Sequence, residues 1–171
     1  MVQDNSGVSK ASGNMCNVVF YRPSKFAIRE VPIILTSDGE YVGESVSYGK
    51  FTVKMPAGKH LFIVWKEGTH AMKANFRAGK TYYVRVTAHM GMFAGRFFLL
   101  PVKPGTEEWK MKDRLLKECD QFSVNRASGQ KTEIEKNSEK VKVVIAKGKR
   151  RFAEYTELEK RQRTINPEDG I

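Results

Sequence analysis

Three histidines and two cysteines are the residues of this chain whose chemistry most often serves catalysis or metal binding. His60 and His70 stand at the starts of expected strands and His89 at the end of another, without the short ligand spacings of a zinc site. Cys16 and Cys119 are too few and too far apart for a disulfide framework, and no nucleophile elbow accompanies any serine. We interpret the histidines as structural or surface residues, two or three of which could converge at one end of the fold, and Cys119 as a small core residue on a helix.

The glycine-rich segment Gly91-Met92-Phe93-Ala94-Gly95 is the other stretch with a possible chemical use, as a phosphate-binding loop. It lacks the Lys-Ser/Thr pair of a P-loop and does not join a strand to a helix. We therefore predict no catalytic residues, no metal site and no cofactor, and a protein that is not an enzyme. An unrecognised enzyme is kept as an alternative.

The run Lys147-Gly148-Lys149-Arg150-Arg151 is the sharpest charge feature of a chain with a formal net charge of +11. It would suit contacts with phosphates or with an acidic partner, through counterion release and arginine hydrogen bonds. It would equally suit a solvated patch on a charged tail. Residues 1–105 hold 14 basic and 6 acidic residues, against 16 and 13 in residues 106–171, so most of the positive excess belongs to the first part of the chain.

Glycines divide the middle of the chain into segments whose apolar residues alternate with polar ones, as in strands with one buried face. Gly58, Gly68, Gly79 and Gly91 follow one another at intervals of 10, 11 and 12 residues, the spacing of strands in an antiparallel sandwich or barrel. The pair Asp38-Gly39 predicts a tight primed hairpin turn. We expect about eight strands, at 18–21, 31–36, 41–42, 51–55, 60–65, 72–76, 82–86 and 96–102.

The composition shifts at residue 106 from glycine and aromatic residues to Glu, Lys and Arg. Thr106 can cap a helix that extends to about Gln121 and carries an apolar stripe, expected to pack on the sandwich. Residues 123–130 read as a linker and residues 131–163 as helical in part, although the β-branched Val141 and Val143–Ile145 leave a short strand open. Asn166-Pro167 is expected to end the helix and leave the last residues frayed. The predicted organisation is a flexible leader (1–15), a β-sandwich domain (16–105) and a charged helical extension (106–171), with a fold class that is mainly β.

The strand and turn segments of residues 17–103 resemble an uncharacterised bacterial family catalogued as domain of unknown function 2846, which is similar to PEGA-type surface β-sandwiches. The likeness rests on Val19–Phe26, the Asp38-Gly39 hairpin with Val42-Gly43, Tyr48–Phe51, Pro56–His60 and Ala78–Val86. The resemblance implies a β-sandwich without known catalytic activity and frequent association with the cell envelope, often as a lipoprotein. It supplies no active-site residues. This chain differs in lacking a lipobox and in carrying the long charged extension.

No apolar run approaches the length of a membrane span, and the polar N-terminus is not that of a secretory signal. The sequence as given predicts a cytoplasmic protein, with the cell envelope as the alternative if a signal was removed. We predict a non-enzymatic structural or interaction module whose tail docks on a protein partner or on a second copy of itself. The alternative is binding of a polyanion, a nucleic acid or an anionic envelope polymer, through a basic face. The candidate partner-binding residues are Lys147, Lys149, Arg150, Arg151, Trp109, Phe152 and Tyr155.

Overall fold

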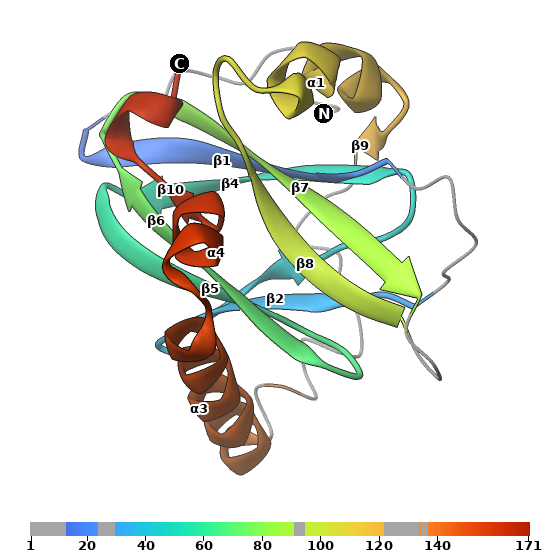
Figure 1. The fold of residues 1–171 in the computed structure, drawn as a ribbon, viewed down its shortest axis with the longest axis vertical. Helices are drawn as coiled ribbons and strands as arrows, with labels where there is room; N and C mark the ends of the chain where they lie inside the picture. The colour runs from blue at the N-terminus through green and yellow to red at the C-terminus, as the bar shows by residue number, and fades with distance from the viewer. Residues whose placement is uncertain (1–12, 24–29, 91–94, 122–133, 135–136) are drawn as a thin grey trace, which may run out of the picture.

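The computed structural model describes residues 13–23, 30–90, 95–121, 134 and 137–171. In this part of the chain ten strands form two sheets of five (Figure 1), so the predicted mainly β fold class is confirmed. Most of the predicted leader, the 123–130 linker and the 91–94 loop lie outside the described residues. The strands are β1 (Met15–Arg22), β2 (Ile33–Thr36), β3 (Tyr41–Glu44), β4 (Gly49–Pro56), β5 (Gly58–Trp65), β6 (Thr69–Phe76), β7 (Thr81–Met90), β8 (Gly95–Val102), β9 (Asp120–Gln121) and β10 (Thr164–Ile165).

The first sheet has the strand order β8-β7-β1-β4-β9, and the second has the order β10-β6-β5-β2-β3. The long neighbours β1–β4, β5–β6 and β7–β8 pair antiparallel, as expected. However, β1 pairs parallel with β7, with Val18 opposite Tyr82, so the sandwich is mixed rather than purely antiparallel. Parallel pairing requires a long connection between the two strands, and here that connection contains strands β2 to β6.

One helix packs on part of the outer face of each sheet, which gives a four-layer arrangement (Figure 1). Helix α1 (Glu107–Lys117) packs Leu115 against the first sheet, where Tyr21 and Val102 are buried. Helix α3 (Ser138–Glu154) packs Val144 and Phe152 against the second sheet. Because both faces of the strands are buried, β1 and β2 are apolar on successive residues rather than alternately.

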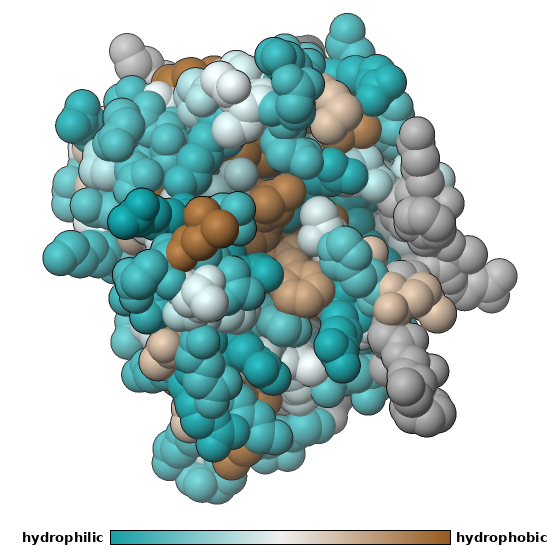
Figure 2. All heavy atoms as spheres, in the orientation of Figure 1, coloured by the Kyte–Doolittle hydropathy of each residue, from teal (hydrophilic) through white to brown (hydrophobic). Residues whose placement is uncertain are grey.

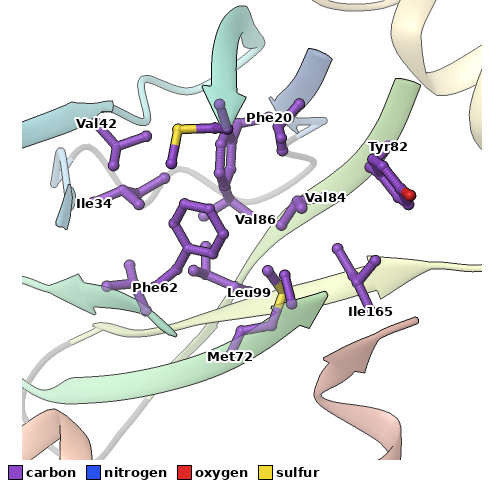
Figure 3. Close-up of a cluster of buried hydrophobic side chains, with 14 of the residues drawn as sticks. Phe20, Ile34, Val42, Phe62, Met72, Tyr82, Val84, Val86, Leu99 and Ile165 are labelled. Carbon is purple, nitrogen blue, oxygen red and sulfur yellow. The ribbon is translucent and has the colours of Figure 1, made fainter. Parts of the chain in front are cut away.

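The core between the sheets is built from the inward-facing residues of both (Figure 3). Phe62 lies at its centre with no exposed surface, and its ring centroid is 5.6 Å from that of Phe20 and 6.0 Å from that of Phe76. Aromatic pairs at such distances add to the stabilisation that burial itself provides. This packing fixes the relative position of the two sheets.

The β2–β3 hairpin forms where Asp38-Gly39 predicted it, with a different turn. Gly39 has a φ of 88°, whereas Asp38 is not among the described residues with positive φ. A type I′ turn needs positive φ at both central residues, so the predicted primed turn is wrong. The Gly39 amide donates to the Thr36 carbonyl, and the register shifts between Ile34 and Leu35.

The helical segments begin where capping residues stand. Thr106 accepts a hydrogen bond from the Trp109 amide, as its predicted role at the start of α1 requires. The helix ends at Lys117, four residues before the expected end, and β9 follows. Residues 138–154 are helical, so the strand alternative at Val141 and Val143–Ile145 is wrong; tertiary packing of one helix face overrides weak β propensity.

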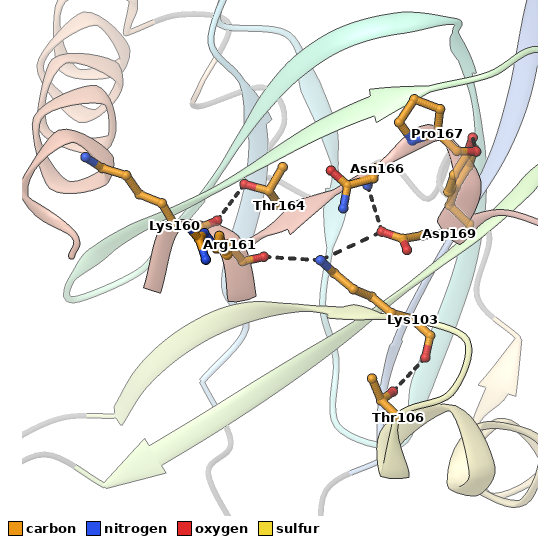
Figure 4. Close-up of polar contacts among 9 residues, drawn as sticks. Lys103, Thr106, Lys160, Arg161, Thr164, Asn166, Pro167 and Asp169 are labelled. Atoms are coloured by element: carbon orange, nitrogen blue, oxygen red, sulfur yellow. Dashed lines mark hydrogen bonds and ion pairs between the residues drawn. The ribbon is translucent and has the colours of Figure 1, made fainter. Parts of the chain in front are cut away.

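The C-terminal residues return to the sandwich, and the expectation that they are frayed is wrong. After α4 (Glu157–Gln162), Ile165 of β10 pairs parallel with β6 and enters the core between the sheets. The Ile171 amide donates to the Thr81 carbonyl, and the Thr81 amide donates to the Ile171 carbonyl. Lys103 ties this segment to the first sheet, since its Nζ donates to the Arg161 carbonyl at 3.1 Å and lies 3.8 Å from a carboxylate oxygen of Asp169 (Figure 4).

Within the described residues, none of the helices has both the length and the apolar character needed to cross a membrane.

Candidate functional site

The cysteines are buried on opposite sides of the first sheet. Cys16 belongs to the core between the sheets and Cys119 to the cluster under α1. Burial raises the pKa of the Cys16 thiol to about 11 and also raises that of Cys119. A thiol must be deprotonated to act as a nucleophile, so burial disfavours that role for both thiols, and Cys119 is a buried core residue as interpreted.

The histidines are divided between two places. The His60 ring lies against Phe76 and its Nε2 is 2.7 Å from the Pro56 carbonyl oxygen. His70 and His89 both contact the ring of Phe98, with centroid distances of 4.0 Å and 5.5 Å. Among the residues that the structure describes, no three His, Cys, Asp or Glu side chains are placed to hold a metal ion.

The basic run lies in the second half of α3, with its charges facing away from the sheet. Lys147, Lys149, Arg150 and Arg151 are all exposed, whereas Gly148 is buried. A Cβ atom on Gly148 would lie 2.7–3.0 Å from side-chain carbons of Ile63, a separation that real contacts do not reach. The glycine therefore lets the basic segment lie directly on the second sheet.

The apolar candidates Phe152 and Tyr155, which lie next to the basic run, face the second sheet. Phe152 and Tyr155 are only 5% and 8% exposed, and both belong to the cluster between α3 and the second sheet. Trp109 is half-buried on α1, where its ring packs edge-on against Tyr83 at 6.1 Å. In this structure Phe152 and Tyr155 contact the chain's own sandwich rather than offering a surface to a partner.

Three arginines from separate elements gather around His70. Arg151 comes from α3, Arg96 from β8, and Arg163 from the residue that follows α4. The Arg163 guanidinium lies between two rings, with its Cζ 4.9 Å from the Phe98 centroid and 4.7 Å from that of Tyr155. Cation–π contacts of this kind hold a guanidinium in place without neutralising its charge.

Burial and these positive charges keep His70 neutral. Burial is the larger cause, and together with the charges of the three arginines it lowers the pKa of His70 to about 4. The His70 Nδ1 and the Tyr155 hydroxyl share a hydrogen bond of 3.0 Å. A positive potential that suppresses protonation of a histidine would favour a bound anion.

Replacement of His70 by glutamine is expected to change how stability depends on pH. The folded-state pKa is below the unfolded value of 6.5, so the unfolded chain binds more protons and the wild type loses stability as the pH falls through 6.5 toward 4. For a partly exposed group we expect a loss of about 1 kcal/mol between pH 7 and pH 5. Urea unfolding at both pH values measures it. Between pH 7 and pH 5 the free energy of unfolding of His70→Gln should fall by about 1 kcal/mol less than that of the wild type. Equal losses would contradict the claim that His70 stays neutral in the folded protein.

A cavity of about 780 Å³, here called the β7–β8 cavity, opens beside these arginines. Its walls come from β7, β8, α1 and the end of α4, and Arg96, Phe98 and Arg163 line it. Figure 2 shows apolar side chains gathered at the centre of the face over β7 and β8, with hydrophilic residues around them. The cavity therefore has an apolar floor and a charged rim.

We call Lys147, Lys149, Arg150, Arg151, Arg96 and Arg163 together the basic surface. Sequence reasoning found its four α3 residues because they are consecutive apart from one glycine. It missed Arg96, Arg163 and their arrangement around His70. No local pattern marks these residues, since they come from elements that meet only through long-range packing.

Comparison with protein-family models, with curated proteins and with solved structures finds no match to this chain. The resemblance to domain of unknown function 2846 stays a prediction.

Proposed function

We propose that this protein is a non-enzymatic interaction module that binds a polyanion through the basic surface. The observation that carries the proposal is that the two faces of α3 differ, one packed on the second sheet and the other charged and exposed. Its buried residues Val141, Val144 and Phe152 pack against the second sheet, while its six basic and two acidic side chains are exposed. A helix with one sheet-packed face and one basic face provides the row of cations that phosphate or sulfate groups along a polymer require.

The surroundings of α3 support the same ligand class. Glu154 lies 3.9 Å from Arg150 and 3.8 Å from Arg151, and all three are exposed, so these ion pairs are weak and a polyanion can replace them. Arg96 and Arg163 extend the positive charge from α3 to the rim of the β7–β8 cavity. The ligand recognised in this way is defined by its charge rather than by base sequence.

A protein partner is the second candidate, favoured by two exposed apolar side chains on the helices. Val143 on α3 is 53% exposed and Leu158 on α4 is 65% exposed. Single exposed apolar residues are common on monomers, so they support this candidate less strongly than the charges support the first. Contact through them, with another protein or a second copy, would persist at high salt.

Reversal of two charges on α3 should weaken polyanion binding by about tenfold or more, because each lost phosphate contact removes a released counterion. The variant is Lys149→Glu/Arg150→Glu, and the measurement is fluorescence anisotropy of a labelled 20-base-pair DNA duplex at low salt. Labelled heparin in a parallel titration distinguishes a nucleic acid from an anionic polysaccharide.

The matched control is Lys54→Glu/Arg77→Glu, which reverses one lysine and one arginine at exposed positions on β4 and the β6–β7 turn. It changes the net charge equally and should bind nearly as the wild type does. Equal weakening in both double variants would mean that only overall charge matters, and no binding of either polymer by the wild type would refute the proposal.

A further inference from the structure

We propose that the β7–β8 cavity binds an amphipathic anion, a ligand with an apolar chain and a single anionic headgroup. The cavity shares Arg96 and Arg163 with the basic surface but none of its four α3 residues, and the inference does not rest on polyanion binding. The cavity has a volume of about 780 Å³, which lies within the range of small-molecule sites.

The floor of the cavity follows the outward side of β8. Phe98 and Leu100 alternate there with the core residues Phe97 and Leu99, and Thr87 of β7 lies opposite Phe98 in the ladder. From Arg96 to Leu100 the strand covers about 13 Å, and Leu115 of α1 continues the apolar lining. An extended alkyl chain lying along β8 would cover this floor.

The charges of the rim are arranged unevenly along the cavity. Arg85 and Glu108 form an ion pair of 2.7 Å on the side of α1. At the other end Arg96 pairs across the ladder with His89, and Arg163 stacks on Phe98. Glu108 lies in the first turn of α1, and Glu118, the other carboxylate that lines the cavity, directly follows the helix. Arg22 also lines the cavity but is buried and donates to the Glu30 and Ser45 carbonyls. The accessible positive charge away from the two carboxylates therefore lies at the Arg96–Arg163 end.

These two features together define the ligand class. An apolar chain on the floor would remove Phe98 and Leu100 from water, and a phosphate or carboxylate would lie between Arg96 and Arg163, where arginine geometry suits its oxygens. A simple inorganic anion would leave the floor exposed, and an uncharged chain would leave the two arginines without an anion inside the cavity. Both parts of the ligand are needed.

The test is isothermal titration calorimetry of the full chain with dodecyl phosphate below its critical micelle concentration, with circular dichroism to confirm that the protein stays folded. Binding of dodecyl phosphate is expected. Octyl phosphate should bind at least about tenfold more weakly, because four methylenes are lost from the buried chain. Inorganic phosphate and dodecyl maltoside should bind more weakly still.

Two variants locate the site. Thr87 lies opposite Phe98 in the ladder and lines the cavity, so Thr87→Trp should fill the floor and abolish binding. Arg96→Gln removes an exposed headgroup contact and should weaken binding about tenfold, whereas Arg161→Gln, which changes an exposed arginine outside the cavity lining, should not. Absence of dodecyl phosphate binding, equal binding of inorganic phosphate, or unchanged binding in both cavity variants would each overturn the proposal. The duplex titration with the α3 variants is unaffected by any of these outcomes.

Discussion

Ile165→Ala is expected to lower the free energy of unfolding by about 2–5 kcal/mol, the range for large-to-small changes in a packed core. Ile165 is 2% exposed and belongs to the core between the sheets, although only six residues follow it in the sequence. Its strand β10 pairs parallel with β6, so the lost packing would loosen the edge of the second sheet. Equilibrium urea unfolding followed by tryptophan fluorescence measures the change.

Leu158→Ala is the matched control, because it removes a similar apolar volume from the neighbouring helix α4 at a side chain that is 65% exposed. Its effect should stay within about 0.5 kcal/mol, as for surface substitutions in general. Similar losses for the two variants would mean that the C-terminal segment does not enter the core.

Gly148→Val should destabilise the protein by about 1–3 kcal/mol through overpacking. A Cβ atom at this position would lie 2.7–3.0 Å from side-chain carbons of Ile63, so α3 must move away from the second sheet. The intrinsic helix propensity of valine is slightly better than that of glycine, and the loss therefore has to come from the contact with the sheet. Thermal and urea unfolding of the variant give its magnitude.

Ala146→Val controls for the β-branched side chain itself, since Ala146 is exposed on the same helix. Helix propensity alone predicts a cost of roughly 0.6 kcal/mol there. If Gly148→Val cost no more than Ala146→Val, the close approach of α3 to Ile63 would be contradicted.

The strands could be predicted because alternation and turn glycines are local signals. All eight expected strands are present, and their bounds differ by a few residues at the ends. The parallel pairing of β1 with β7 could not be predicted, since strands far apart in the sequence carry no local mark of their partner. The pairing of β10 with β6 could not be predicted either. Asn166-Pro167 indicated only the end of a helix, and that helix ends earlier, at Gln162, before β10 begins.

The candidate site was predictable only where its residues are consecutive. The charges of the Lys147–Arg151 run are exposed on α3, with Gly148 against the sheet. Phe152 and Tyr155 were predicted to bind a partner, and nothing in their local sequence shows that they pack with Val141 and Val144 against the second sheet. Arg96, Arg163 and His70 needed the fold, because strands and helices from distant parts of the chain bring them together.

The salt dependence of duplex DNA binding tests the central claim, polyanion binding through the basic surface, most directly. The measurement is the slope of log K against log salt concentration for the wild type and for Lys149→Glu/Arg150→Glu. If the six cations of the basic surface each neutralise a phosphate, the wild-type slope is about −5.4, and the double variant is shallower by about 2. A slope near zero, or a slope that the double variant leaves unchanged, would contradict the claim.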